Sequence, residues 1–439
     1  MKSGKKYNRH KRSLYKTIKL RMKLYSIKRA AANKLHVKGN PLNIAMFTDT
    51  YPPDINGVSI SVLTLTESLR ERGHNVYVFT TTEDTKFSGI SIEDQTIRIS
   101  SVRLKKFYGY GLSKPFSIRG INYLRKLKID VIHIHTDFTL RIIGETCAGI
   151  LDIPVVYTYH TMYEDYTNYV SKYTRGHFEN TLKRFAKWFS KTSNNHCAKI
   201  ISPSEKTKKA LIRYGVTAGL SVIPTGIDLS KFMHTDSEKL ESLKKKFDLA
   251  DRFCAVYLGR IAKEKSIEVL IEAMKEVVKT DTSILLLIIG YGPYEDELKK
   301  HVKECGLEDN VRFLGKAGHD EVPLYYKLGD IFVSASKSET QGITYIEALA
   351  SSLPVLAQYD ECIKDIINEK ENINGNFFRD TKTLIKLILK YKNMDKVEYN
   401  IICKNAKDST ERFSIQAFGA AVEEVYEDVV EKFELKMEN

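Results

Sequence analysis

Short apolar runs alternate with amphipathic stretches along most of the chain, and the alternation starts twice. In the first series, apolar runs of strand length are separated by stretches whose apolar residues have helical spacing. The predicted strands are 43–48, 75–80, 130–135, 155–159 and 199–202, with helices at 64–72 and 205–214 and a helical stretch between 135 and 155. This alternation predicts a parallel sheet with helices on both faces.

A second series begins at residue 254 and repeats the pattern. Its predicted strands are 254–258, 284–289, 311–314, 331–334 and, as the last strand, 355–357, and its helices are 266–278, 294–305 and 343–351. Two successive doubly wound series predict an α/β protein with two Rossmann-like domains. Since ligands bind at the carboxyl ends of such strands, we expect the site in a cleft that the two domains face.

The predicted domain boundaries follow the two series. The parts are an N-terminal arm over 1–40, a first domain over 41–226, a second domain over 227–412 and a C-terminal helix over 413–439. In the last part, Phe418, Val422, Val425, Tyr426 and Val429 recur at helical spacing. This spacing predicts one long amphipathic helix over 413–433 that packs on the body.

The charge of the chain is concentrated in the arm. The 439 residues carry 69 Lys and Arg against 55 Asp and Glu, a formal net charge of +14. Residues 1–40 hold fourteen of the basic residues and no acidic one, so the rest of the chain is neutral. That rest is uneven, because 41–227 has 24 basic and 16 acidic residues whereas 228–439 has 31 and 39. We expect the basic half to face something anionic, either a membrane surface or a nucleic acid.

Two basic stretches bear on that choice. In the arm, apolar residues recur every three or four positions beside lysines, which suits a helix adsorbed on anionic lipid and equally a disordered tail. Residues 95–129 contain no acid and interleave cations with aromatic residues, which suits lipid headgroups or single-stranded nucleic acid. No RNA-binding motif or helix-turn-helix pattern accompanies them, so we expect an anionic membrane surface as partner and no nucleic acid.

Some functional classes lack their usual sequence marks. The longest apolar run, 284–289, has the length of a strand, and residues 1–40 lack the apolar core of a secretory signal. The six cysteines form no C-x-x-C pair, which indicates free thiols and a cytoplasmic protein. With the basic stretches, we expect a protein that is peripheral on the inner face of the cell membrane. No H-E-x-x-H, Walker A, G-x-S-x-G or G-x-G-x-x-G motif occurs, which leaves protease, NTPase, serine-hydrolase and oxidoreductase functions unsupported.

Two carboxylates flank a predicted helix start in the segment SETQGITYIEALA. Glu339 lies in the loop before Gly342, and Glu347 lies on the helix behind it. Carboxylates in such places can bind sugar hydroxyls, and the first amides of the helix can bind phosphate. In YLGRIAKEKS, Arg260 and Lys265 follow a predicted strand, where they suit a diphosphate or, alternatively, a solvated loop.

The first series offers weaker signals. His160 ends a predicted strand and suits a sugar or base contact, or plain packing. His133 and His135 alternate on another strand, so we expect one of them to be buried. Gly57 opens a helix after the first strand, where the missing side chain could let a phosphate approach the backbone.

The motifs together resemble those of the retaining GT-B glycosyltransferases. FTDTYPPDINGV, SVIPTGIDLSKF, LGRIAKEKS, IIGYGPYEDEL and SETQGITYIEALA occur in the order of that family, and the resemblance covers residues 43–430. YHTMYEDYTNYV and AQYDECIKDII look most like segments of the bacterial 1,2-diacylglycerol 3-glucosyltransferases. The chain departs from the common pattern at 359–362, where the family often has a Gly-rich turn, so the resemblance assigns no donor contact there.

The resemblance implies charged donor-binding residues in the second domain. Arg260 and Lys265 would neutralise the diphosphate of the donor, and Glu347 would hold its ribose hydroxyls. Glu339 would bind the hexose near its 3- and 4-hydroxyls. With His160, the residues Arg260, Lys265 and Glu339 are the expected catalytic group.

Uncharged donor contacts are implied as well. The backbone amides of Ile343 and Thr344, after Gly342, would bind the phosphate. His160 would contact the hexose near its 6-hydroxyl, and Gly57 would let the first loop approach the phosphate.

The implied activity is the transfer of glucose, with retention, from UDP-glucose to the 3-hydroxyl of 1,2-diacylglycerol at the membrane surface. The product would be monoglucosyldiacylglycerol, and the alternative is another lipid-linked or polysaccharide acceptor. No two aspartates lie two positions apart, which argues against a nucleotide-sugar site built on such a metal-binding pair, so no metal or other cofactor is expected. No side chain in the motifs suits a covalent nucleophile, so we expect front-face attack with the leaving phosphate as base.

Overall fold

The computed structural model describes residues 37–54, 56–82, 90–93, 95–103, 111–113, 118–137, 139–160, 197–233, 236–250, 252–337, 339–367 and 373–438. The predicted arm up to residue 36, the aromatic residues at 107, 108, 110 and 116, and residues 161–170 of the segment YHTMYEDYTNYV lie outside the described residues.

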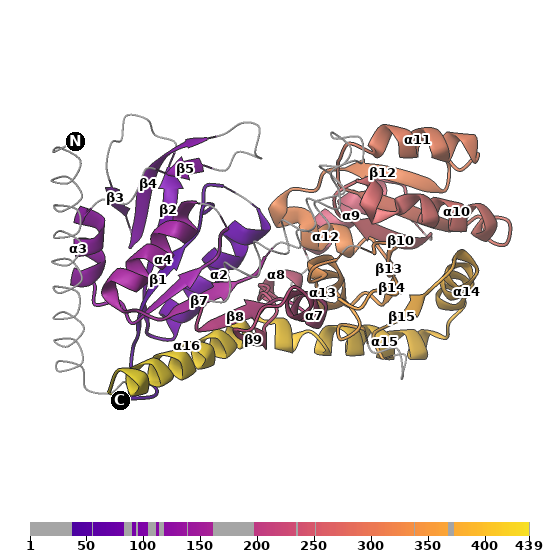
Figure 1. The fold of residues 1–439 in the computed structure, drawn as a ribbon. Helices are drawn as coiled ribbons and strands as arrows, with labels where there is room; N and C mark the ends of the chain where they lie inside the picture. Colours follow the sequence, from indigo (N-terminus) through magenta and orange to yellow (C-terminus); the bar gives the residue numbers. More distant parts are fainter. Residues whose placement is uncertain are drawn as a thin grey trace. The chain divides into compact units, whose positions relative to one another are not determined.

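The described chain forms two compact units (Figure 1). Unit 1 comprises the chain up to Pro203, Lys208–Ile223 and Phe418–Asn439, and unit 2 comprises Ser204–Thr207 and Pro224–Ala417. The main boundary, between Ile223 and Pro224, lies close to the one predicted at 226/227. The C-terminal helix α16 (Ile415–Glu438) begins in unit 2 and continues into unit 1.

Unit 1 is built on a nine-stranded sheet with the order β3-β4-β2-β1-β6-β7-β8-β9, in which β5 also pairs with β4. The strands are β1 (Asn43–Phe47), β2 (Asn75–Thr82), β3 (Ile90–Glu93), β4 (Thr96–Arg103), β5 (Gly111–Ser113), β6 (Val131–Ile134), β7 (Val155–Thr158), β8 (Lys199–Ser202) and β9 (Gly219–Val222). Among the described strands of this sheet, only β3 and β5 pair antiparallel, each with β4. The strand order reverses between β1 and β6, which makes the carboxyl ends of these strands the expected ligand position.

Helices cover both faces of this sheet (Figure 1). On one face lie α2 (Gly57–Glu71) and α16, and on the other lie α3 (Ile118–Lys126), α4 (Thr139–Leu151) and α7 (Glu205–Arg213). In β1, Ile44 and Met46 pack toward α2 and α16, whereas Ala45 and Phe47 pack toward α4. The first strand therefore reads as one continuous apolar run, because both of its faces are buried.

Unit 2 is a six-stranded parallel sheet with the order β12-β11-β10-β13-β14-β15. Its strands are β10 (Phe253–Leu258), β11 (Ile284–Ile289), β12 (Val311–Gly315), β13 (Ile331–Ser334), β14 (Val355–Gln358) and β15 (Gly375–Phe378). Its helices are α8 (Ser230–Met233), α9 (Ser237–Lys246), α10 (Ile267–Val277), α11 (Glu295–Glu304), α12 (Val322–Tyr326), α13 (Ile343–Ala350), α14 (Thr381–Lys392) and α15 (Lys396–Asp408). Here the strand order reverses between β10 and β13.

The predicted fold class is correct, and individual elements differ from their predictions. The strand predicted at 355–357 is not the last one, because β15 follows and pairs parallel with β14. Its sequence, GNFF, is too short and too polar at its start for an apolar run. Helix α2 begins at Gly57, as predicted for that residue, and includes most of the stretch predicted at 64–72. The Asn56 side chain caps it by accepting a hydrogen bond from the Ser59 amide, 3.0 Å away.

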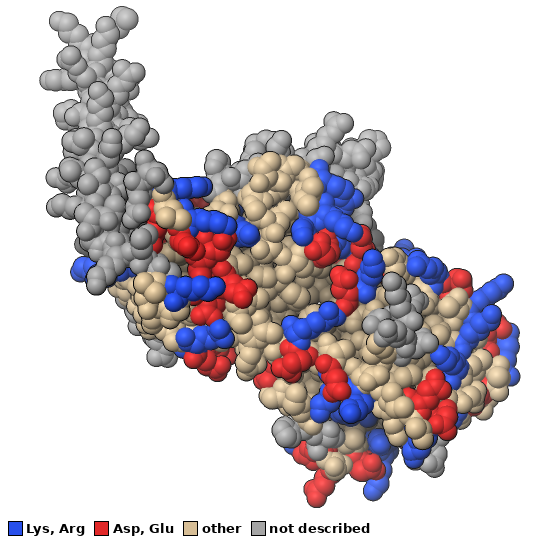
Figure 2. Space-filling model, turned by 90° about the horizontal axis from the view of Figure 1, so that it is seen from below, with Lys and Arg blue, Asp and Glu red and all other residues tan. Residues whose placement is uncertain are grey.

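The helix predicted over 413–433 is α16, and its apolar positions are buried against unit 1. Phe418, Val422, Val425, Tyr426 and Val429 pack with residues of β1, β2 and α2 in one core. No helix in the described part of the chain is both long and apolar enough to cross a bilayer. Figure 2 shows basic and acidic side chains interspersed over the described surface of the face that it draws.

Candidate active site

In unit 2, the two central strands carry the predicted donor-binding residues at their carboxyl ends. β10 and β13 are parallel neighbours, so the loops that follow them emerge at the same edge of the sheet. The loop after β10 holds Arg260 and Lys265, and the loop after β13 holds Glu339. These loops lie where the strand order reverses, the place at which open α/β sheets bind ligands.

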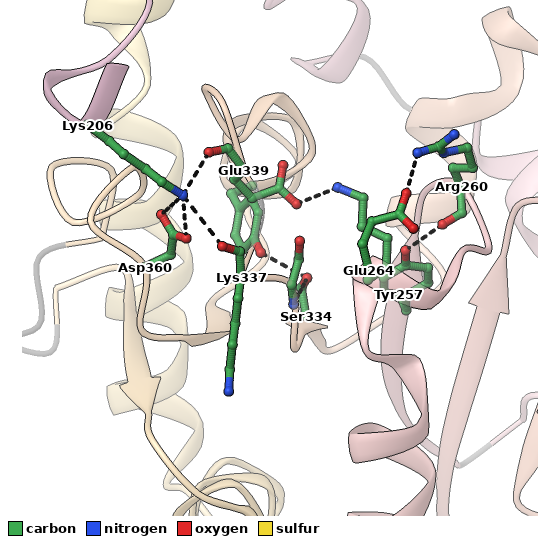
Figure 3. Close-up of polar contacts among 11 residues, drawn as sticks. Lys206, Tyr257, Arg260, Glu264, Ser334, Lys337, Glu339 and Asp360 are labelled. Carbon is green, nitrogen blue, oxygen red and sulfur yellow. Dashed lines mark hydrogen bonds and ion pairs between the residues drawn. The ribbon is translucent and has the colours of Figure 1, made fainter. Parts of the chain in front are cut away.

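A short ion pair joins the two loops. The Lys265 Nζ lies 2.7 Å from Glu339 Oε1, and both side chains are largely buried (Figure 3). Arg260, on the same loop, instead pairs with Glu264, four residues further along the chain, and is more exposed. The Tyr257 hydroxyl donates to the Arg260 carbonyl over 3.0 Å, which fixes the start of this loop. Both predicted phosphate-binding cations thus have a carboxylate partner in the described structure.

Helix α13 places Glu347 behind the start of the helix. Gly342 caps α13 with φ +80°, and a Cβ on it would lie 2.6 Å from Ile363 Cγ2, so both conformation and space require glycine. Ile343 and Thr344 form the first turn, in which backbone amides have no acceptor within the helix. The chain can therefore offer amides to an anion at this point.

The Glu347 carboxylate is held by a tyrosine of the neighbouring helix α12. The Tyr326 hydroxyl donates to Glu347 Oε2 over 2.9 Å. Burial raises the pKa of Glu347 to about 7, and the hydrogen bond from Tyr326 opposes this rise. Near neutral pH the carboxyl group is therefore divided between its protonated and ionised forms.

In unit 1, histidines occupy the equivalent strand ends. His133 lies on β6, and His135 and His160 follow β6 and β7. His135 Nδ1 is 3.1 Å from His160 Nε2, while His133 contacts the Thr158 hydroxyl at 2.7 Å. We expected one of His133 and His135 to be buried, and in the structure both side chains are buried. The reason is that β6 is a central strand and is covered on both faces.

These histidines are neutral at physiological pH. Burial lowers the pKa of His160 to about 4 and places the pKa values of His133 and His135 well below the ordinary value. Neighbouring imidazoles lower the last two further. A neutral imidazole can donate one hydrogen bond and accept another, which suits a hydroxyl group.

Gly57 is the first residue of α2 and is exposed. A Cβ built on it would meet no atom within 4 Å among the described residues, so the space beside it is open. This arrangement is compatible with the predicted approach of a ligand to the backbone.

The structure brings some of the predicted residues into contact, while others have different partners or belong to the other unit. Lys265 and Glu339 are in contact, and Gly342, Ile343, Thr344 and Glu347 share one helix start. Arg260 shares the loop of Lys265 but not its partner, and His160 and Gly57 belong to unit 1.

Sequence reasoning missed two polar residues beside Glu339 and Glu347. One is Lys206, whose Nζ lies 2.8 Å from Asp360 Oδ2 and 3.2 Å from the Glu339 carbonyl oxygen (Figure 3). The other is Tyr326, the hydroxyl donor to Glu347. Their signal in the sequence is slight: Lys206 follows the carboxyl end of β8, and Tyr326 is an aromatic residue on a short helix.

One group of side chains in the described residues could hold a metal ion. Glu272, His301 and Cys305 offer ligand atoms within 4.8 Å of one another on α10 and at the end of α11. His301 Nε2 lies 2.8 Å from Glu272 Oε1, so an ion pair or hydrogen bond already accounts for this proximity. None of the predicted donor-binding residues belongs to the group.

Both halves of the chain match families of glycosyltransferases. Residues 55–231 match the family described as Glycosyltransferase Family 4, and residues 239–408 match Glycosyl transferases group 1. The fold agrees, since UDP-bound HepE of Anabaena superposes with a TM-score of 0.66 at 18% identity, over 88% of this chain and 99% of that one. Sucrose-phosphate synthase of Thermosynechococcus elongatus gives a TM-score of 0.67 at 21% identity, over 88% and 98%. The chain belongs to the group 1 glycosyltransferases of GT-B fold and is a hexosyltransferase.

Two curated relatives carry the same name. The alpha-monoglucosyldiacylglycerol synthase of Acholeplasma laidlawii is 35% identical over 402 residues, which cover 90% of this chain and 99% of the relative. The alpha-monoglucosyldiacylglycerol synthase of Streptococcus pneumoniae is 37% identical over 339 residues, 75% of this chain and 74% of the relative. A more distant relative, the sulfoquinovosyl transferase SQD2 of Arabidopsis thaliana, is 27% identical over 86% of this chain and 72% of the relative.

Proposed function

We propose that the protein transfers glucose from UDP-glucose to the 3-hydroxyl of 1,2-diacylglycerol, with retention at the anomeric carbon and without a metal ion. The observation that carries the proposal is the 35% identity to the Acholeplasma laidlawii synthase over 90% of the chain. The residues of unit 2 support it, because a sugar diphosphate needs cations for its phosphates and carboxylates for its hydroxyls.

In this proposal the ion pair between Lys265 and Glu339 opens when the donor binds. Lys265 and Arg260 turn to the diphosphate, and the Glu339 carboxylate accepts hydrogen bonds from the 3- and 4-hydroxyls of the hexose. Each charge exchanges one partner for another, so that none is left buried and unpaired. The amides of Ile343 and Thr344 add donors to the phosphate.

The remaining donor contacts are neutral or titrate near pH 7. Glu347 accepts hydrogen bonds from the ribose hydroxyls, and the ionised form is the better acceptor. His160, neutral through its low pKa, contacts the 6-hydroxyl of the hexose, and the backbone at Gly57 comes close to the phosphate.

The reaction exchanges one bond at the anomeric carbon for another on the same face. The bond from C1 to the β-phosphate oxygen breaks, and a bond from C1 to the glycerol 3-oxygen forms. The proton of the acceptor hydroxyl passes to the leaving phosphate, so UDP departs with the charge that the cations stabilise. Fixed cations and amides aimed at this charge commonly contribute about 10²–10³ in rate each.

The diacylglycerol acceptor requires access to a membrane, and we assign this contact to the basic N-terminal arm on the cytoplasmic side. Residues 1–40 carry fourteen cations and no acid, whereas the described surface in Figure 2 mixes both signs. Deleting residues 1–36 should weaken binding to vesicles that contain anionic lipid and leave UDP-glucose binding unchanged. Sedimentation with vesicles at two salt concentrations measures this effect, and equal sedimentation of both proteins would remove the arm from the proposal.

The decisive test is product formation by the full chain. The purified protein is incubated with UDP-glucose and diacylglycerol in anionic vesicles, with and without EDTA, and the lipids are analysed by mass spectrometry. We expect monoglucosyldiacylglycerol in both cases, with an α-anomeric coupling in the NMR spectrum. A panel of other nucleotide sugars and acceptors runs in parallel. If only another acceptor is glycosylated, the family assignment stands and the acceptor proposal fails.

A further inference from the structure

Lys206 is hydrogen-bonded to the loops that follow the neighbouring strands β13 and β14. It is the second residue of α7, and with Ser204–Thr207 it belongs to unit 2. Its Nζ lies 2.8 and 3.1 Å from the two Asp360 carboxylate oxygens and 3.2 Å from the Glu339 carbonyl oxygen (Figure 3). The Lys337 carbonyl oxygen is 3.5 Å away. An ammonium group has three N–H donors, and these partners account for all of them.

Asp360 is the buried anchor of this contact. Its side chain is 6% exposed, and one of its oxygens also accepts the Cys362 amide at 2.7 Å. It lies in the segment 359–362, where the chain departs from the Gly-rich turn common in the family. A carboxylate this deeply buried needs a charged partner, and Lys206 supplies it.

The loop that carries Glu339 is therefore held from several sides. Lys206 binds the Glu339 carbonyl, whereas Lys265 binds the carboxylate of the same residue at 2.7 Å. The Ser204 hydroxyl donates to the Thr340 carbonyl over 2.7 Å, and the Gln341 side chain donates to the Thr225 carbonyl over 2.9 Å. A loop whose main chain is fixed in this way presents its side chain in one orientation, which is what a sugar-binding carboxylate requires.

We propose that Lys206, anchored by Asp360, is a positioning residue that sets the orientation of Glu339 toward the hexose of the donor. The inference rests on the proposed function, because it takes Glu339 as the hexose contact. Lys206 acts on the main chain of Glu339, while Arg260, Lys265 and Glu347 serve the diphosphate and the ribose. Losing Lys206 should therefore weaken binding of the hexose more than binding of the nucleotide.

The test compares the affinities of UDP and UDP-glucose by calorimetry on the full chain. In Lys206→Met, which removes the charge and keeps the apolar stem, we expect the Kd of UDP-glucose to rise about tenfold and that of UDP by less than twofold. Lys279→Met makes the same chemical change at an exposed lysine paired with Glu276 on the far end of α10, and it should alter neither Kd. The ratio of the two Kd values is a readout that a general loss of stability would not change.

Two further variants separate positioning from stability. Asp360→Asn keeps an acceptor for Lys206 and should raise the Kd of UDP-glucose about threefold, which provides a second measurement if Lys206→Met folds poorly. In the double variant Lys206→Met/Asp360→Asn no buried charge is left unpaired, so the melting temperature should recover toward wild type. The ratio of the Kd values should stay high, because the carbonyl contacts remain absent.

Three results would contradict the inference in different ways. If Lys206→Met binds both ligands like wild type, Lys206 does not position Glu339. If both affinities fall equally, or if the double variant restores the ratio together with stability, the role of Lys206 is structural only. If the wild-type chain binds neither ligand, the proposed function itself fails, and the inference fails with it.

Discussion

The two units share one architecture but carry different chemistry where their strand order reverses. In unit 1 β6 and the segments after β6 and β7 hold histidines that bond to one another and to hydroxyl groups, beside an ion pair that directly follows β6. In unit 2 they hold ion pairs, Lys265 with Glu339 and Lys206 with Asp360, beside a carboxyl group at Glu347. The difference shows that one architecture can carry neutral imidazoles at its central strand ends in one unit and, in the described part of the chain, none there in the other, depending on which side chains the loops supply.

This difference gives the two units opposite responses to pH. In unit 1 burial lowers histidine pKa values, so stability is lost as pH falls from about 6.5, where the unfolded chain takes up protons, toward about 4. In unit 2 burial raises the pKa of Glu347 from the ordinary value of 4.5 to about 7. The stability that this group contributes is therefore lost as pH rises from 4.5 through 7. This contrast between the histidines of unit 1 and the paired charges and buried carboxyl group of unit 2 can be tested by mutation and by pH.

The largest effect is expected from removing the charged pair of unit 2. Glu339→Ala and Lys265→Ala should each lower kcat/KM for UDP-glucose by about 10²–10³, since each removes a fixed charge at the reacting donor. Initial rates of glucolipid formation measure the loss, and circular dichroism checks folding. Wild-type rates in both variants would refute their assignment to the donor site.

The acid response of unit 1 is expected to be next in size. On going from pH 7 to pH 4.5, the lowered pKa of His160 should cost unit 1 about 2 kcal/mol of stability, with further loss from His133 and His135. Hydrogen exchange of peptides from β6 and β7, corrected for intrinsic rates, measures this loss, and His160→Gln should reduce it. Equal behaviour of peptides from β10 and β13 would contradict the contrast between the units.

A smaller effect is expected from the titration of Glu347. Hydrogen bonds from the ribose favour the ionised carboxylate, so affinity for UDP-glucose should rise about tenfold between pH 5.5 and pH 8 and level off above 7. UDP-glucose is the suitable ligand, because a terminal phosphate titrates near pH 6 itself. In Glu347→Gln the affinity measured by calorimetry should not vary with pH. A slope retained in this variant would assign the titration to another group.

The smallest effect is expected on the free energy of unfolding when Arg260 is replaced. Its ion pair with Glu264 is largely exposed, so Arg260→Ala should change the free energy of unfolding by less than about 1 kcal/mol. Affinity for UDP should nevertheless fall, because Arg260 is proposed to bind the diphosphate. Urea denaturation and calorimetry measure the two quantities. A large loss of stability with unchanged UDP affinity would make Arg260 a structural residue.

The sequence by itself determined the α/β class and the central strands of both units. β11 has the predicted bounds, because a strand buried on both faces is apolar along its whole length. The helix start at Gly342 could also be predicted from the sequence, since Glu339, Gly342 and Glu347 lie within one short segment and helix capping is local. The short or polar elements β15 and α9 were not predicted from the sequence, because their hydrophobic pattern is weak and their place is fixed by neighbouring strands and helices.

Only the tertiary structure decided which charged residues meet. Lys265 and Glu339 are 74 positions apart, and Lys206 and Asp360 are 154 apart, so no local pattern links them. Lys265 meets Glu339 because the parallel strands before them, β10 and β13, end at the same edge of the sheet. Lys206 meets Asp360 because the first residues of α7 belong to unit 2 and contact the loop after β14. Burial then shifted the pKa values of His160 and Glu347 in opposite directions, since the cost of removing a charge from water depends on the folded surroundings of the group.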